Sequence, residues 1–380
     1  MDEPRIEPGG AKVIGWGVGP VLEKLSGVTK IAVLRGGGLG DLMFALPAAA
    51  ALRAAYPEAA LTLLGTPGHR ELLRSTHSPI QHVRILPFSE GVRPGPENPG
   101  EVDKFFDETT SEHFDLAIQL HGGGRFSNPF VRRLGARLSA GLRTADAAEL
   151  DRSLPYHYYQ HEPLRALEVV GLVGAPPVEL EARLSPFPAF VQKAESLLHP
   201  FVPPLLAIHP GASDPRRRWP VEFFRQVAAA CAAEGYTVVV VGAGCDKDLA
   251  AKVVPAASSG QVRSLAGLLD LGTLAALLAR CTVFLGNDSG PRHLAQAVGT
   301  PTVGLYWAGN LINAGPLGRG LHRAHLSWVT HCPNCDVDVT QVGYTAARCP
   351  HDPSLLSPIR PEDVLADVKT LARASFDSHS

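Results

Sequence analysis

Asp41 is the residue of this sequence whose position best suits chemistry. It ends the glycine-rich turn Gly36–Gly40, which follows the short aliphatic run Ile31–Leu34. Apolar residues then recur at helical spacing as far as Leu52. A strand, a glycine turn and a helix in this order place the carboxylate at the carboxyl end of a sheet strand, where open α/β sheets bind ligands. The helix dipole keeps such a carboxylate ionised, which favours a base over an acid.

The glycine turn does not fit a dinucleotide site. The dinucleotide fingerprint is G-x-G-x-x-G, and counting from Gly36 the third glycine falls at Asp41, whose charge would repel a pyrophosphate. In a second candidate, residues 238–244, Lys247 occupies the position where the fingerprint requires the third glycine. In addition, no carboxylate follows Gly242 at the sequence distance needed to hold a ribose. No glycine turn leads into Gly-Lys-Ser/Thr, so the sequence also excludes a P-loop.

Two segments in the second half of the chain combine a strand end, polar side chains and a helix start. His209–Ser213 leads to Arg216–Pro220, where backbone amides, a hydroxyl and guanidinium groups suit a diphosphate. Gly286–His293 also follows a strand and opens a helix, with Asp288 and Ser289 as good cap residues. An exposed basic loop and a well-capped helix are the structural alternatives to two anion sites.

Three of the six cysteines cluster near the C-terminus. Cys332 and Cys335 form C-x2-C, and Cys349 and His351 form C-x-H, a spacing that can supply four zinc ligands. From the sequence alone we favour reduced thiols over a metal or a disulfide, so the predicted site residues include no metal ligand. The other three are interpreted as core thiols: Cys231, Cys245 and Cys281.

Two runs of alternating strand and helix patterns predict the α/β class, with parallel sheets covered by helices on both faces. Strands are predicted at 31–35, 61–65, 83–86, 116–120 and 138–142, and again at 205–209, 236–241, 282–285 and 302–306. Helices in the second run are predicted at 220–235, 246–254, 271–280 and 291–298. The Pro/Gly-containing stretch 174–188 is the predicted linker. We therefore predict domains at 1–180 and 181–360, and a helix within 361–380 that packs back on the N-terminal domain.

Composition limits the classes of function. The chain has 380 residues and a net charge of −2, which gives no electrostatic case for nucleic acid. No apolar run has the length of a membrane span, and the N-terminus lacks a signal-peptide pattern. We expect a cytoplasmic protein, and composition leaves peripheral contact with the inner face of a membrane open.

The motifs together resemble a known family, the ADP-heptose:lipopolysaccharide heptosyltransferases, which form glycosyltransferase family 9. The matching segments fall in the family's order: Arg35–Asp41 with Pro47 and Leu52-Arg53, Tyr56-Pro57, His209–Gly211, Arg217–Pro220, Gly242-Ala243 and Gly286–Gly290 with His293. The resemblance implies the GT-B architecture, in which two Rossmann-like, doubly wound domains face a cleft and the C-terminal domain binds the donor nucleotide. It also implies inversion at the anomeric carbon with neither a metal ion nor another cofactor.

The resemblance implies roles for individual residues. Asp41 matches the family's catalytic base. The structural alternative is that Asp41 is a helix N-cap, a role that is compatible with catalysis. The family usually carries Lys at the position of Arg217. The arginine keeps the positive charge and adds bidentate geometry. The predicted donor-binding residues are Ser213, Arg217, Asp246, Asp288, Ser289, Gly290 and His293. The predicted acceptor-binding residues are Gly38, Gly40, His121 and Arg125, and for the last two a plain surface loop is the alternative.

These expectations describe an inverting glycosyltransferase that moves a sugar, expected to be heptose from ADP-heptose, to a hydroxyl of a glycan, glycolipid or natural product. Its partners are then the nucleotide-sugar donor and a saccharide or glycolipid acceptor, and the glycines of the turn leave room for the acceptor sugar. Two other functions suit the same architecture: a sugar-nucleotide epimerase and a sugar-nucleotide binder without catalysis.

Overall fold

The structure is a computed structural model that describes residues 12–14, 16–199, 203–254, 260–342 and 345–377. The ends of the predicted domains, 1–11 and 378–380, lie outside the described residues. The chain divides into two compact units, one made of Met1–Arg70 and Ser78–Ala182 and the other of Glu71–His77 and Arg183–Ser380.

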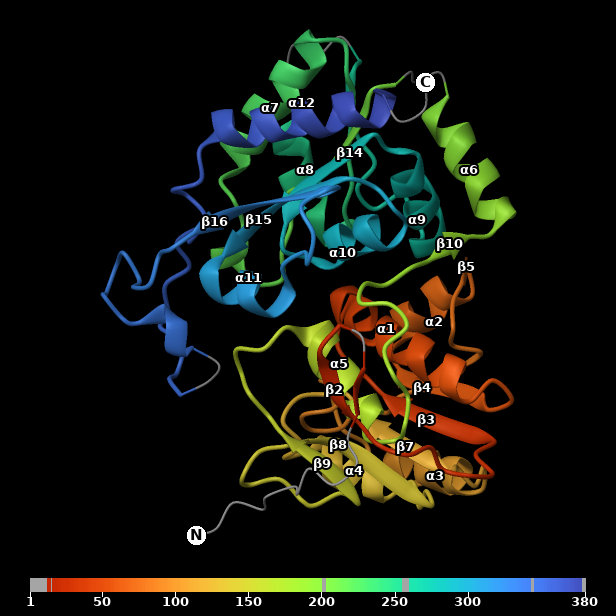
Figure 1. The fold of residues 1–380 in the computed structure, drawn as a ribbon. Helices are drawn as coiled ribbons and strands as arrows, with labels where there is room; N and C mark the ends of the chain where they lie inside the picture. The colour runs from red at the N-terminus through yellow and green to blue at the C-terminus, as the bar shows by residue number, and fades with distance from the viewer. Residues whose placement is uncertain (1–11, 15, 200–202, 255–259, 343–344, 378–380) are drawn as a thin grey trace. The chain divides into compact units, whose positions relative to one another are not determined.

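The first unit is built on a parallel sheet of six strands in the order β6-β4-β3-β7-β8-β9 (Figure 1). The strands are β3 (Lys30–Leu34), β4 (Ala60–Gly65), β6 (His82–Ile85), β7 (Leu116–Gln119), β8 (Leu138–Arg143) and β9 (Arg152–Pro155). From β3 the chain first adds strands on one side and then crosses to β7 on the other. This reversal makes the carboxyl ends of β3 and β7 a topological switch point, where ligands bind in such sheets.

Helices cover both faces of this sheet. Buried side chains of α3 (Pro99–Thr110) and α4 (Ser127–Arg132) pack on Ala32 and Leu34 of β3, while α1 (Leu39–Ala55) packs against α5 (Glu162–Gly171) on the opposite face. The hairpin β1 (Lys12–Ile14) and β2 (Val18–Val21) lies beside α5, and α2 (Pro67–Leu73) follows β4. The alternation of buried strand side chains thus fixes one core on each face.

The second unit has the same plan, with strand order β13-β12-β11-β14-β15-β16, all parallel. The strands are β11 (Leu205–His209), β12 (Thr237–Val240), β13 (Val262–Ser264), β14 (Val283–Asn287), β15 (Thr302–Trp307) and β16 (His322–Ser327). The order reverses between β11 and β14, so their carboxyl ends form the switch point of this unit. A two-residue antiparallel ladder joins β5 (Thr76–His77) to β10 (Ser185–Pro186).

The helices of the second unit again lie on both sides of the sheet (Figure 1). One core is shared by α7 (Val221–Ala233), α8 (Lys247–Val253) and α12 (Pro361–Asp377). The remaining helices are α6 (Pro188–Leu198), α9 (Leu271–Arg280), α10 (Gly290–Ala297), α11 (Ala308–Ala314) and the short 3-10 turns η1 (Pro215–Arg217), η2 (Gly244–Asp246) and η3 (Val339–Gln341). None of the helices in the described part of the chain is long and apolar enough to cross a membrane.

The predicted α/β class is confirmed, and every predicted strand is present within a few residues of its expected bounds. Three edge strands of the two six-stranded sheets, β9, β13 and β16, were not predicted, nor were the short strands of the two small ladders, β1, β2, β5 and β10. Three helix starts of the second unit differ by one residue from the prediction. Pro220 is the N-cap of α7, Asp246 belongs to η2 with α8 starting at Lys247, and α10 starts at Gly290.

The C-terminal helix differs most from the expectation. We expected it to pack on the N-terminal domain, whereas α12 packs on α7, β14 and β15 of the second unit. Its apolar side chains recur at helical spacing and are buried in that unit's core, at Val364, Val368, Leu371 and Ala372. Lys369 on the same helix contacts Glu234, at the end of α7.

Candidate functional site

Asp41 lies at the switch point of the first unit, in the first turn of α1. The helix starts at Leu39 with Gly38 as its N-cap, so Asp41 is the third helical residue rather than the cap. Its Oδ2 accepts a hydrogen bond of 2.8 Å from the Gly38 amide. The carboxylate therefore turns back on the start of its own helix, as the acidic residue of a capping box does.

Two glycines of the turn make room for the protein's own atoms. A Cβ on Gly37, whose φ is +86°, would lie 2.4 Å from Oδ2 of Asp41, and a Cβ on Gly36 would lie 2.4 Å from the carbonyl oxygen of Val92. The expectation that these glycines leave space for an acceptor sugar is therefore wrong for Gly36 and Gly37. At Gly38 the nearest atom to an added Cβ is 3.9 Å away, so space remains there.

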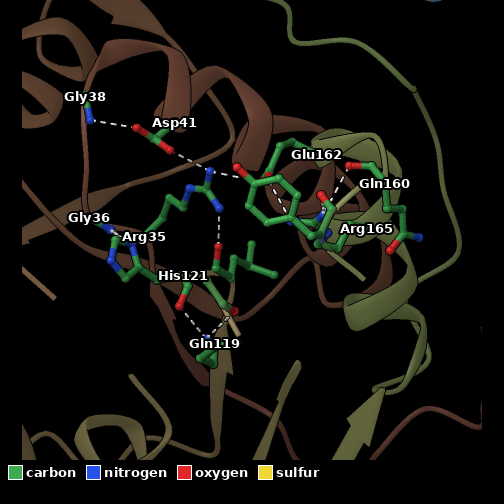
Figure 2. A network of polar contacts seen from close by, with 12 residues as sticks. Arg35, Gly36, Gly38, Asp41, Gln119, His121, Gln160, Glu162 and Arg165 are labelled. Atoms are coloured by element: carbon green, nitrogen blue, oxygen red, sulfur yellow. Dashed lines mark hydrogen bonds and ion pairs between the residues drawn. The ribbon is translucent and has the colours of Figure 1, made fainter. Parts of the chain in front are cut away.

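A network of charged side chains holds Asp41 from the other side (Figure 2). Nη2 of Arg35 lies 2.7 Å from Oδ1 of Asp41 and 3.1 Å from Oε2 of Glu162. The other oxygen of Glu162 accepts a 2.6 Å hydrogen bond from Arg165. Two carboxylates and two guanidinium groups alternate, so the network is electrically balanced although Arg35 and Arg165 are buried.

The network favours the ionised form of Asp41. Partial burial by itself would raise the pKa of Asp41, but the charge of Arg35 and the Gly38 amide outweigh it and hold the pKa below its usual value of 3.8. Its side chain nevertheless remains 40% exposed. Asp41 is thus a fixed carboxylate that is ionised at neutral pH and open to a ligand.

Two histidines support the turn. His121 follows β7, and its Nδ1 accepts a 3.2 Å hydrogen bond from the Gly36 amide; burial and the charge of Arg35 lower its pKa, so the ring is neutral at pH 7. His69 is buried, and its Nε2 donates to the Gly38 carbonyl at 2.9 Å, while Nδ1 accepts from the amide of Thr66. Both rings position the backbone that holds Asp41.

Arg125, the fourth predicted acceptor residue, lies apart from this network. Its side chain is 68% exposed, pairs with Asp146 at 3.7 Å and lies over the ring of Phe126. Its interactions therefore match the surface-loop alternative. Gly40 lies in the first turn of α1 beside Asp41.

In the second unit, two loops leave the neighbouring strands β11 and β14 at the switch point. The register pairs His209 with Gly286, so both loops start at the same level of the sheet. Asn287 ties them together: its Oδ1 accepts from the amide of Trp219 at 3.0 Å, and its Nδ2 donates to the carbonyl of Pro210 at 2.8 Å. Asn287 is fully buried, so this link is structural.

Asp288 is a buried anion with three polar partners. It lies 2.9 Å from Nε2 of His293, 3.3 Å from Nη1 of Arg217 and 2.9 Å from Nδ2 of Asn310. Burial would raise the pKa of Asp288, but His293 and Arg217 lower it below its usual value. Nδ1 of His293 accepts from Arg292, so its Nε2 carries the proton donated to Asp288.

The more exposed polar groups suit an anion. Arg217 donates to Oγ of Ser213 at 2.8 Å and keeps about a quarter of its side chain exposed. Ser289 is the N-cap of α10, yet its hydroxyl does not cap the helix and lies 3.0 Å from Nδ1 of His209. His209 reaches Asp246 on its other side, at 3.6 Å. Hydroxyls, a guanidinium and the start of a helix thus gather at one sheet edge.

The sequence also matches known proteins. The profile of Glycosyltransferase family 9 (heptosyltransferase) matches residues 102–335, more than half of the chain and part of both units. The chain belongs to glycosyltransferase family 9. The resemblance found in the motifs is thereby confirmed, although the matched range does not include Asp41 and its turn.

Individual relatives extend this result. The lipopolysaccharide heptosyltransferase 2 of Salmonella typhimurium is 36% identical over 107 residues, which cover 27% of this chain and 31% of that protein. The chain thus aligns with about a third of this relative's length. Among solved structures, a family 9 glycosyl transferase from Veillonella parvula has a TM-score of 0.72 at 21% identity, covering 91% of this chain and 97% of its own.

The ADP-heptose LPS heptosyltransferase II of E. coli has a TM-score of 0.68 at 20% identity, covering 91% of this chain and 99% of its own. Both structures share the α/β fold with its two parallel sheets, so the GT-B fold class is confirmed. At this level of identity the likeness concerns the fold.

The geometry brings most predicted residues of this family member together. Asp41, Gly38, Gly40 and His121 gather at the first switch point. The seven predicted donor residues gather near the second: Ser213, Arg217, Asp246, Asp288, Ser289, Gly290 and His293.

Sequence reasoning missed several residues of these clusters. Arg35, His209 and Asn287 belong to quoted motifs, so a buried charge or polar group beside a strand end was an available signal. No local signal marks the other four, because the fold alone brings them close: His69, Glu162, Arg165 and Asn310.

Proposed function

We propose that the protein is an inverting glycosyltransferase that moves heptose from ADP-heptose to a hydroxyl of a lipopolysaccharide-core type of acceptor. Family membership and the names of the relatives support the class of reaction. The observation that carries the mechanism is Asp41, an ionised carboxylate that is fixed by Arg35 and Gly38 and remains open to a ligand.

Asp41 acts as the general base. Each of its oxygens accepts one hydrogen bond from the protein and keeps lone-pair capacity for the acceptor hydroxyl. As the hydroxyl oxygen bonds to the anomeric carbon, the bond from that carbon to the diphosphate oxygen breaks and the proton passes to Asp41. Attack opposite the leaving group inverts the anomeric centre.

The second unit holds the donor and stabilises the leaving diphosphate. Arg217, the hydroxyls of Ser213 and Ser289, and the start of α10 at Gly290 offer donors to the phosphate oxygens. The buried Asp288 fixes Arg217 in advance. These charges are in place before the bond breaks, so the reaction needs no metal ion at the diphosphate.

The first unit receives the acceptor. Gly38 is the open position of the turn, and His121 keeps its backbone in place. A core-type acceptor is attached to a lipid, so we propose that the protein works in the cytoplasm with peripheral contact at the inner face of the membrane.

The test is an assay of the full chain with ADP-heptose and a truncated-core acceptor. We expect ADP release, a glycosylated product of inverted configuration by NMR, and a rate that added Mg²⁺ leaves unchanged. Conversion of the donor in the absence of acceptor indicates an epimerase and overturns the transferase. Binding of ADP-heptose without turnover, together with unchanged behaviour of Asp41→Ala, indicates a binder and also overturns it.

A further inference from the structure

The stretch between β16 and α12, blue in Figure 1, brings three cysteines and a histidine together. The ligand atoms of Cys332, Cys335, Cys349 and His351 all lie within 4.8 Å of one another. Among the residues that the structure describes, no other group of three or more His, Cys, Asp or Glu side chains meets as a possible metal site. The fold thus closes a gap of 13 residues between Cys335 and Cys349.

The spacing between these atoms suits one transition-metal ion. Metal–sulfur bonds of about 2.3 Å in a tetrahedron put neighbouring ligand atoms roughly 3.8 Å apart, a small contraction from the present arrangement. All six cysteines are free thiols, so no disulfide competes for these sulfurs. Nδ1 of His351 is buried and has no hydrogen-bond partner among the described residues. A buried nitrogen without a partner costs free energy unless a ligand such as a metal ion binds it.

An apolar shell covers part of the cluster. Cys332 is 2% and Cys349 is 8% exposed, and both pack with Val339 and Leu355. Trp307, at the end of β15, packs against the same group. Such a shell keeps water from two of the sulfurs, which suits a permanent ion rather than an exchanging one.

We propose that Cys332, Cys335, Cys349 and His351 bind one tetrahedral transition-metal ion, zinc or iron, as a structural site. Four protein ligands leave no open position for a substrate, so the ion is not part of the glycosyl transfer. Thiolates are soft ligands and imidazole suits both zinc and iron, so a set of three thiolates and one imidazole accepts either metal in this geometry. From the sequence alone we favoured reduced thiols here, so these four residues are not among the predicted site residues.

The ion holds the segment that supports the phosphate-binding turn. The amide of Leu355 donates to the carbonyl of Arg216 at 2.8 Å, and the hydroxyl of Ser354 donates to the carbonyl of Arg218 at 2.5 Å. The indole of Trp219 donates to the carbonyl of Ile359 at 3.0 Å. These bonds lie on both sides of Arg217, so loss of the ion loosens that turn. This second step rests on the proposed function of Arg217.

Metal analysis of the purified, tag-free full chain tests the site. We expect about one equivalent of zinc or iron per chain, and elemental analysis by mass spectrometry distinguishes the two. Cys332→Ser and Cys349→Ser should lose the metal. Cys245, which we expected in the core, is exposed and lies outside the cluster, so Cys245→Ser should keep the metal. Equal metal content in wild type and Cys332→Ser, or no bound metal in wild type, overturns the proposal.

Cobalt spectroscopy gives a readout that does not depend on activity. Protein stripped by a chelator and loaded with Co²⁺ should show thiolate-to-cobalt charge-transfer absorption and tetrahedral d–d bands. His351→Ala should shift these bands because one ligand becomes water, and it keeps the test valid if the cysteine variants fold poorly. Octahedral-type spectra, or identical spectra for wild type and His351→Ala, contradict a Cys3His site.

ADP binding tests the coupling to the turn. Stripped protein should bind ADP severalfold more weakly than the metal-loaded protein, and added metal should restore the affinity. Unchanged ADP affinity after complete metal loss removes the role in supporting Arg217 but leaves the metal site standing. If the loaded protein does not bind ADP at all, the proposed donor site fails instead, so the two failures are distinguishable.

Discussion

Nη2 of Arg35 lies 2.7 Å from Oδ1 of Asp41 and also contacts Glu162, on a helix more than a hundred residues further along the chain. Arg35 is thus shared between two carboxylates, and Glu162 in turn pairs with Arg165. An arginine paired only with Asp41 could swing with it, whereas the shared arginine is fixed by two elements. The consequence is a carboxylate at Asp41 whose orientation is set before any ligand binds, as the proposed role of a general base requires.

Replacing Asp41 by Asn should abolish transfer and leave donor binding intact. The amide keeps the shape of the side chain but cannot accept a proton, so kcat should fall by about 10²- to 10⁴-fold. The measurements are product formation with ADP-heptose and ADP affinity by calorimetry. Asp103→Asn, an exposed carboxylate on α3, is the matched control and should behave as wild type. Loss of ADP binding in Asp41→Asn would place Asp41 on the wrong substrate.

The pH profile should depend on Arg35. The folded-state pKa of Asp41 is held below 3.8, so its carboxylate is ionised throughout the neutral range. The stability that this ionised carboxylate contributes is present above the unfolded pKa and is lost as the pH falls through the lower folded pKa. Arg35→Gln removes the main charge that lowers this pKa, so the acid limb of kcat/KM should move up by about one to three pH units.

Glu162→Gln should not shift the acid limb of the kcat/KM pH profile upward as Arg35→Gln does. It removes a negative charge near Asp41 and leaves Arg35 with one carboxylate, so the acid limb should stay or move to lower pH. Arg84→Gln, which breaks an exposed pair with Glu112, is the control and should leave the profile unchanged. An upward shift of the acid limb in Glu162→Gln would show that the network acts only by holding structure.

The sequence predicted the fold well because its elements are strongly patterned. Buried parallel strands such as β11 are continuous aliphatic runs, and glycine or proline marks many of their ends. β16 reads His-Arg-Ala-His-Leu-Ser, a polar edge strand whose pattern does not differ from that of a loop. The packing of α12 depends on which surface has a matching apolar groove, and that follows only from the assembled sheet.

The candidate site was predictable where its residues lie in one motif. Asp41 and its turn, or Ser289 beside Asp288, are local, so spacing alone indicated them. Glu162 was not predictable, because its contact with Arg35 bridges 127 residues and depends on how α5 packs beside α1. The cysteine spacing allowed a metal, but only the structure brings the four ligand atoms within reach of one ion.

Gly37→Ala should impair both stability and transfer, whereas Gly38→Ala should affect stability little. The Gly37 backbone has φ of +86°, and a Cβ there would lie 2.4 Å from Oδ2 of Asp41, so the base must move. The backbone strain alone costs about 1 kcal/mol or more. Thermal unfolding and kcat measure the two effects. A normal kcat for Gly37→Ala would contradict the assigned base, while a raised acceptor KM for Gly38→Ala would support acceptor contact at the open glycine.

Asp288→Ala should destabilise the second unit by about 3 kcal/mol or more, because it removes a buried anion that contacts both Nε2 of His293 and the guanidinium of Arg217. The folded-state pKa of Asp288 is also lowered, so this stabilisation is present above the unfolded pKa and is lost only as the pH falls through the folded value. Urea unfolding at neutral pH gives the difference. Asp248→Ala, an exposed residue of α8, should change stability by only about 0.5 kcal/mol. A similar small change for Asp288→Ala would mean that the cluster is not held by this anion.

Arg217 should matter for ADP affinity more than for folding. Its side chain is partly exposed, and its bonds to Ser213 and Asp288 fix the guanidinium before a ligand arrives. Arg217→Gln removes a charged hydrogen bond to phosphate worth about 2 kcal/mol, or roughly thirtyfold in Kd. Arg217→Lys keeps the charge but loses the planar fork of the guanidinium, so its Kd for ADP should lie between those of wild type and Arg217→Gln.

Arg225→Gln, which replaces an exposed arginine of α7, is the control. Calorimetry at two salt concentrations measures the affinities, and the loss should shrink at high salt because screening weakens the wild-type contact. If Arg217→Gln and Arg225→Gln bind ADP equally well, the diphosphate does not lie against Arg217, and the loop that carries Ser289 must bind it without a guanidinium.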